Sequence, residues 1–203
     1  MRIPAFFAVH KDGELMATDG RFSGHRALKG ERTVSLSSAV AEGSIKECRA
    51  PAVIIDCSSL SSMSFDEQVV KHLRVKGADV WFMTFIRDAD DVFDAFNTDA
   101  ETLLAPYHSV ASDDDWRDIL DVSDSVVFCH KGKAISRKGS LVDIGKTLDS
   151  LVSIGFYKNC VVDTDGSIPT DLWRDISEDY PSTVPLTDYT VGLFENEIVP
   201  FLI

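Results

Sequence analysis

Residues 51–85, PAVIIDCSSLSSMSFDEQVVKHLRVKGADVWFMTF, set the expected architecture of this chain. They hold a branched apolar run at Pro51–Ile55, a helix-like stretch at Ser64–Lys76 and a second apolar run at Val80–Phe85. A strand, a crossover helix and another strand make up the repeating unit of a parallel sheet. The segment therefore predicts an α/β fold.

The start and end of the expected helix carry their own signals. Ser64 and Glu67 have the spacing of a capping box, and Gly77 follows the last helical position. The same alternation of apolar runs and helix-like stretches continues on both sides, which predicts further parallel strands. The predicted strands are Ile3–Val9, Thr33–Leu36, Ala52–Ile55, Val80–Phe85, Thr102–Pro106, Val126–Cys129, Cys160–Val162 and Thr183–Leu186.

The length of the chain limits how these units can be arranged. At 203 residues we expect one domain, residues 1–203. A complete eight-fold (β/α) barrel typically needs ~250 residues, so we expect a reduced barrel of the TIM type with some helices missing. Lys11-Asp12-Gly13 predicts a hairpin after the first strand, residues 19–30 a surface loop, and Val191 onward a closing helix.

Composition excludes several classes of partner. The net charge is −13, from 33 acidic and 20 basic residues, so the chain would repel nucleic acid and anionic membrane surfaces. No apolar run approaches the length of a membrane span. The four cysteines form no CxxC pair, which argues against a zinc ribbon and for a reducing, cytoplasmic setting. We expect no cofactor.

Four segments together resemble a known family. Ile3-Pro4-Ala5 before Lys11-Asp12-Gly13, Ile86-Arg87-Asp88, VVFCHKGK at 126–133 and FYKNCVVDTDGS at 156–167 are similar to motifs of the histidine-biosynthesis ribotide isomerase barrels. That family comprises ProFAR isomerase and its cyclase relative. The resemblance implies a ribulose-phosphate-binding type of barrel in a divergent, archaeal member, with isomerase- or lyase-like chemistry on a small anionic ligand.

The chain departs from the family at the catalytic and phosphate-binding positions. The first-strand catalytic aspartate falls on Phe7 or Val9, and the fifth-strand one falls on His130. The phosphate-binding glycines fall on Met83-Thr84-Phe85 and on Asp188-Tyr189-Thr190. The resemblance therefore implies fold and ancestry more than the family's own reaction.

Polar residues follow most of the predicted strands. Since function lies at the carboxyl ends of parallel strands, we expect His130 and Asp163 to act as the acid and base of any reaction. Lys133, with the basic loop at 21–29, would attract a small anionic metabolite over the same end. The expected ligand-binding residues are His10, Asp56, Arg87, His108, Asp165, Asp188 and Lys133.

Two other functions fit the same residues. A non-catalytic binding or assembly barrel, in the form of a homo-oligomer for example, would have a mouth filled by Phe6, Phe7, Trp81 and Phe85 instead of an open polar one. A metal-dependent hydrolase would use His10, His108 and His130, since imidazoles bind zinc. The preferred hypothesis assigns no metal ligand.

Overall fold

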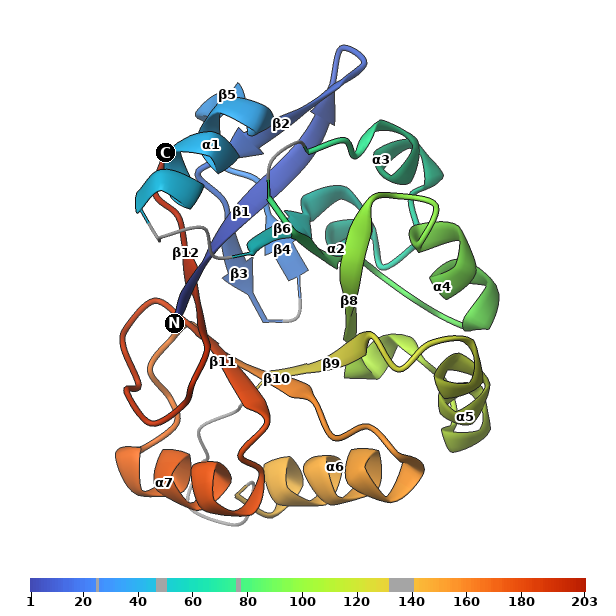
Figure 1. The fold of residues 1–203 in the computed structure, drawn as a ribbon, viewed down its shortest axis with the longest axis vertical. Coiled ribbons are helices and arrows are strands. Elements are labelled where there is room, and N and C mark those ends of the chain that lie inside the picture. Colours follow the sequence, from blue (N-terminus) through green and yellow to red (C-terminus); the bar gives the residue numbers. More distant parts are fainter. Residues whose placement is uncertain (25, 47–50, 76–77, 132–140) are drawn as a thin grey trace.

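Eight parallel strands form a closed barrel in the computed structural model, which describes residues 1–24, 26–46, 51–75, 78–131 and 141–203. The barrel closes because the last strand pairs with both the first strand and the one before it, at Arg2↔Glu197 and Leu186↔Ile198 (Figure 1). The expected α/β, TIM-type barrel is confirmed. In sheet order its strands are β1 (Arg2–Lys11), β6 (Ala52–Asp56), β7 (Val80–Met83), β8 (Ala100–Pro106), β9 (Val126–Lys131), β10 (Asn159–Asp163), β11 (Thr183–Thr187) and β12 (Glu197–Pro200).

Helices surround most of this barrel. Apolar side chains on alternate positions of β1 show the two layers: Phe7 lies in the barrel interior, whereas Phe6 lies between the barrel and the helices. Figure 1 shows the helices outside the strands. They are α1 (Leu36–Lys46), α2 (Cys57–Ser62), α3 (Glu67–His72), α4 (Ala89–Ala95), the 3-10 helix η1 (Tyr107–Ser109), α5 (Asp113–Val122), α6 (Leu141–Ile154) and α7 (Thr170–Asp179).

The segment between β1 and α1 builds two antiparallel additions to the barrel. Beyond the reach of β12, β1 pairs with β2 (Glu14–Thr18), and β2 pairs with β5 (Thr33–Ser35). The turn between β1 and β2 places Gly13 at φ +86°. The loop expected between β2 and β5 instead contains a small separate sheet of β3 (Arg21–Ser23) and β4 (Arg26–Leu28).

The prediction of one helix over Ser64–Lys76 is wrong. Among the described residues of this range, the helix is confined to α3, which begins after Asp66 and ends where Leu73 takes an extended conformation. The preceding helix α2 lies before the range and ends at Met63, which has a left-handed φ of 56°. The predicted capping box is wrong as well. Asp66 is the N-cap of α3, and its carboxylate accepts the backbone N–H of Gln68 at 2.9 Å.

The closing helix expected from Val191 onward is also wrong. Gly192 adopts a positive φ of 73°, and the carboxylate of Glu197 accepts the backbone N–H groups of both Val191 and Gly192. These contacts hold a loop that leads into β12, whose Ile198 is fully buried in the barrel. The eighth barrel strand is therefore residues 197–200, while Thr33–Ser35 lies outside the barrel.

Candidate site at the carboxyl mouth of the barrel

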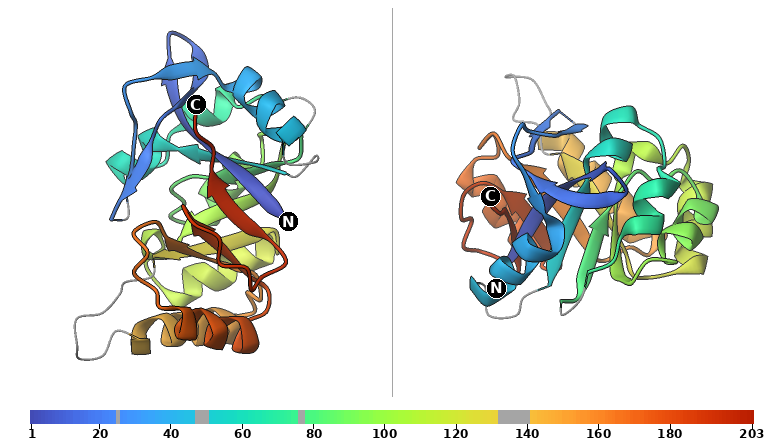
Figure 2. Two further views of the ribbon diagram at one scale, coloured as in Figure 1. Left: turned by 90° about the vertical axis from the view of Figure 1, so that its left-hand side faces the viewer. Right: turned by 90° about the horizontal axis from the view of Figure 1, so that it is seen from above.

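The β3–β4 hairpin covers the carboxyl end of the barrel. Phe22 packs edge-on against Phe7 with ring centroids 5.3 Å apart, and Ala27 is fully buried in the interior cluster. The Ser61 hydroxyl of α2 donates to the carbonyl oxygen of Ala27. Figure 2 (left) shows the hairpin at the end of the barrel opposite the N-terminus. The hairpin thus closes the mouth with apolar contacts and one hydrogen bond.

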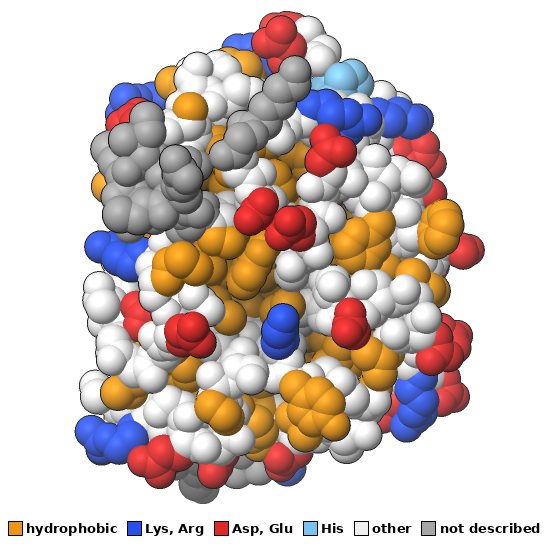
Figure 3. Space-filling view, in the orientation of Figure 1, with side chains coloured by type: hydrophobic (Ala, Val, Ile, Leu, Met, Phe, Trp, Pro, Cys, Tyr) orange, Lys and Arg blue, Asp and Glu red, His pale blue; other side chains and the backbone are white. Residues whose placement is uncertain are grey.

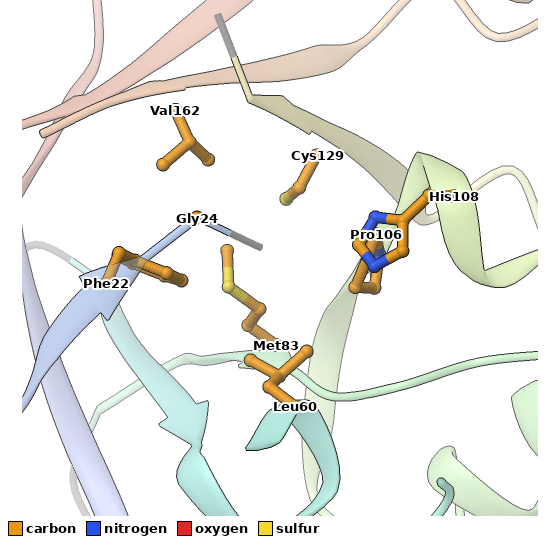
Figure 4. A pocket seen from close by; sticks show the side chains of 8 residues that line it. All are labelled: Phe22, Gly24, Leu60, Met83, Pro106, His108, Cys129 and Val162. Carbon is orange, nitrogen blue, oxygen red and sulfur yellow. The ribbon is translucent and has the colours of Figure 1, made fainter. Parts of the chain in front are cut away.

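Beneath the hairpin lies a small and mainly apolar cavity. The cavity volume is about 20 Å³, whereas one water needs ~10–15 Å³. A phosphorylated sugar does not fit this space while the hairpin is in place. Figure 4 shows the residues that line the cavity, which come from the hairpin, α2, η1 and the four barrel strands β7 to β10. It is lined by Phe22, Gly24, Leu60, Met83, Pro106, His108, Cys129 and Val162.

The aromatic residues expected to fill a non-catalytic mouth divide between three places. Phe7 and Phe85 are buried in the barrel interior. Phe6 lies on the helix side of β1 and packs on Phe201. Trp81 lines a different cavity, at the amino-terminal end of the strands. Two of the four residues therefore fill the mouth, and Phe22 of the hairpin adds a third ring.

His130 lies on the helix side of the barrel wall. Cys129 belongs to the interior cluster, and adjacent strand residues point to opposite faces. The imidazole accordingly meets the edge of Tyr107, with ring centroids 6.1 Å apart. His130 is thus separated from the cavity by the backbone of its own strand.

Asp163 organises the turn between β10 and α7. Its carboxylate accepts hydrogen bonds from the Tyr189 hydroxyl at 2.5 Å, the Ile168 N–H at 2.9 Å, and both the N–H and the hydroxyl of Ser167 at 2.8 and 2.9 Å. Burial acts to raise the pKa of Asp163, but these donors outweigh it and lower the pKa below its ordinary value. The side chain therefore stays ionised, and its oxygens accept donors from the turn and from Tyr189 of the loop after β11.

Asp56 caps the first helix after β6. Its Oδ1 accepts the backbone N–H groups of Ser58 at 3.0 Å and Ser59 at 3.1 Å, and its Oδ2 accepts the Thr84 hydroxyl at 3.1 Å. The residue is fully buried. Burial raises its pKa from 3.8 to about 6, against the opposing effect of these hydrogen bonds. Asp56 thus bonds within the wall of the barrel.

Two further expected ligand-binding residues are engaged in contacts between neighbouring elements. The Arg87 guanidinium forms a two-pronged ion pair with Asp91 of α4, at 2.8 and 2.7 Å. His10 packs on His72 of α3 with ring centroids 4.6 Å apart and the ring planes 39° apart, and its buried Nε2 has no hydrogen-bond partner among the described residues.

The remaining expected residues lie in different surroundings. His108 in η1 is exposed and lines the cavity, with its ring 6.3 Å from that of Phe85. Asp165 and Asp188 are exposed in loops after β10 and β11. Lys133 lies outside the described residues. Of the nine residues expected at the site, the structure places one, His108, against the cavity.

The three histidines of the metal hypothesis have three different neighbours. His10 contacts His72, His108 faces Phe85, and His130 faces Tyr107. Across the described ranges, no group of three or more His, Cys, Asp and Glu side chains is arranged to hold a metal ion. The structure therefore does not bring the three imidazoles together.

The opposite end of the barrel carries a wider opening. Its cavity volume is about 220 Å³, against about 20 Å³ beneath the hairpin, and its lining includes Trp81, Lys158 and Glu195. Figure 3 shows this face, with apolar side chains near its centre and charged ones around them. The polar lining comes from the segments that precede the strands, whereas catalytic groups of barrel enzymes lie at the other end.

Several residues at the mouth were absent from the expected site. Leu60, Met83 and Cys129 line the cavity. Side chains alternate between the two faces of a strand, so Met83 and Cys129 can be assigned to the same face only when the orientation of each strand is known. Both faces of these strands are buried and apolar, so the pattern does not show which face is interior. Phe22 had no signal, because the loop that carries it has no periodicity.

Compared with known proteins, the chain matches no family model and no curated sequence. The fold by itself defines the class of protein: an α/β protein built on a closed, eight-stranded parallel barrel of the TIM type. None of the helices in the described residues has the length and apolar character needed to cross a membrane.

Proposed function

We propose that this protein is a non-catalytic barrel that functions by binding. The observation that carries the proposal is the closed mouth: an apolar hairpin covers a cavity that holds little more than one water. Enzymes with this fold place acid, base and phosphate-binding groups around an open mouth.

The capping roles of the strand-end carboxylates support the same conclusion. Asp56 and Asp163 follow β6 and β10, where a barrel enzyme would carry reactive groups. Every oxygen of the two carboxylates accepts a hydrogen bond from within the protein, from the wall, the β10–α7 turn or Tyr189. Since a general base needs a lone pair directed at the substrate, these side chains serve the fold. The buried free thiols Cys57, Cys129 and Cys160 fit a reducing, cytoplasmic setting.

A second candidate is an isomerase- or lyase-like step on a small anionic ligand, as the ribotide isomerase resemblance implies. Its two residues, His130 and Asp163, lie at the ends of adjacent strands, with His130 paired to Val161 in the register. His130 would have to turn from the helix side of the wall toward the mouth. For this reaction the hairpin would have to leave the mouth. Arg21 and Arg26, both exposed on the hairpin, would then meet the anion.

A thermal-shift panel of sugar phosphates and ribotides separates the two candidates. If the protein is a binding barrel, we expect no phosphorylated ligand to stabilise it. The same result is expected for the Phe22→Ala variant, in which the hairpin is loosened. A ligand at one hundred times its dissociation constant would stabilise the protein by ~2.7 kcal/mol. Such a shift, lost in His130→Ala and kept in the exposed-site control Phe93→Ala, would establish the second candidate instead.

A further inference from the structure

Two thiols lie on adjacent strands in the barrel interior, and one of them lines the mouth cavity. Cys129 of β9 and Cys160 of β10 are direct partners in the register of the parallel pair, and both side chains belong to the interior cluster. Both thiols are free. Cys160 is fully buried and Cys129 is 6% exposed, because it also lines the cavity.

A third sulfur enters the same cavity from β7. Met83 is 2% exposed and its thioether points into the space that Cys129 lines, as Figure 4 shows. The other lining residues are Phe22, Gly24, Leu60, Pro106, Val162 and the exposed His108. Water needs two to four polar partners to occupy a cavity, and the side chains of this lining, apart from His108, offer sulfur and hydrocarbon.

The size and chemistry of this space select one kind of ligand. About 20 Å³ accommodates a single ion, whereas a metabolite needs several hundred. Thiolate and thioether sulfurs are soft donors that prefer Cu(I), while structural zinc takes four nitrogen or sulfur ligands in a tetrahedron. We propose that Cys129, Cys160 and Met83 form a binding site for one Cu(I) ion beneath the β3–β4 hairpin.

The binding step leaves all oxidation states unchanged. Each cysteine forms a Cu–S bond and loses its thiol proton to the solvent, so that Cu⁺ and two thiols give a bis-thiolate complex of charge −1 and two protons. The Met83 sulfur adds a neutral lone pair. The hairpin then separates the ion from water and oxidants, which keeps Cu(I) from being oxidised.

The test is an anaerobic titration of the full chain with Cu(I), supplied as its acetonitrile complex and competed with a chromophoric Cu(I) chelator. A Cys48→Ser/Cys57→Ser variant, which keeps only the two paired thiols, should bind one equivalent as tightly as the wild type. In that background Cys129→Ser or Cys160→Ser should weaken binding by more than the ~100-fold that loss of an outer-shell partner produces. Met83→Leu, a volume-conserving change, should weaken it less but measurably.

Folding and coordination are checked separately from affinity. Far-UV circular dichroism and the melting temperature show which variants are folded, and Cys129→Ala and Cys160→Ala replace any serine variant that is not. X-ray absorption should show sulfur neighbours only. Three results would each overturn the site. The Cys48→Ser/Cys57→Ser variant could fail to retain copper, or the Cys129 and Cys160 variants could bind Cu(I) as tightly as their Cys48→Ser/Cys57→Ser background. The third result is nitrogen and oxygen neighbours of copper in the X-ray absorption spectrum. None of these results would alter the closed mouth on which the proposed function rests.

Discussion

Asp56 is a buried polar residue of the barrel wall that is held by hydrogen bonds, and its burial makes the free energy of unfolding depend on pH. Burial raises its pKa from 3.8 to about 6, so the native state favours the protonated carboxyl more than the unfolded chain does. The stabilisation that protonation brings is complete below pH ~4 and is lost as the pH rises through 6. The shift corresponds to about 3 kcal/mol between these limits.

The Asp56→Asn variant tests this dependence. The asparagine oxygen still accepts the N–H groups of Ser58 and Ser59, and its amide can donate to the Thr84 hydroxyl. Urea unfolding from pH 4 to pH 8 should show the variant gaining about 3 kcal/mol relative to the wild type as the pH rises. The exposed N-cap variant Asp88→Asn serves as control. If the difference in the free energy of unfolding between the wild type and Asp56→Asn is constant across this pH range, the prediction is contradicted.

At the scale of elements, the β3–β4 hairpin covers the mouth and is held there by few contacts. Its ring contact between Phe22 and Phe7 and its buried Ala27 carry most of the apolar packing. We expect Phe22→Ala to lower the local opening free energy by about 1.4 kcal/mol, because the ring contact and its buried area are lost.

Hydrogen exchange gives the measurement for the hairpin. Amides of residues 21–28 should exchange about ten-fold faster in Phe22→Ala, while those of β8 to β10 stay unchanged. The control Phe93→Ala removes a ring that is 68% exposed on α4 and should leave the hairpin unaffected. Uniformly faster exchange throughout the barrel would show that the hairpin and barrel open together, contrary to this prediction.

The molecule as a whole depends on the closure made by β12. Ile198 is fully buried, and in the strand register it pairs with Ile3 of β1 on one side and with Leu186 of β11 on the other. Truncation to alanine leaves a cavity where both seams meet, and core changes of this kind cost 2–5 kcal/mol. Ile198→Ala should therefore lower the urea midpoint of the whole protein in a single transition.

Leu202→Ala provides the matched comparison, since Leu202 is 90% exposed and lies two residues beyond the end of β12 at Pro200. It should change the free energy of unfolding by less than ~0.5 kcal/mol. An Ile198→Ala protein that unfolds at the wild-type midpoint would show that β12 adds little to closure.

The sequence by itself determined the barrel class and seven of its eight strands. These features follow from local signals, namely apolar runs and their alternation with helix-like stretches, which need no knowledge of distant residues. The limits of α3 and the loop at Gly192 were missed because an N-cap at Asp66 and a loop held by the Glu197 side chain leave little trace in the apolar pattern.

Only the tertiary structure decided what faces the mouth. In a strand buried on both sides, a shift of one residue exchanges the two faces, so the outward direction of His130 and the inward direction of Cys129 depend on register with neighbouring strands. Closure through β12 and the folding of the Phe22 hairpin over the cavity are contacts between residues far apart in the chain. Such contacts are set by packing, and no local pattern specifies them.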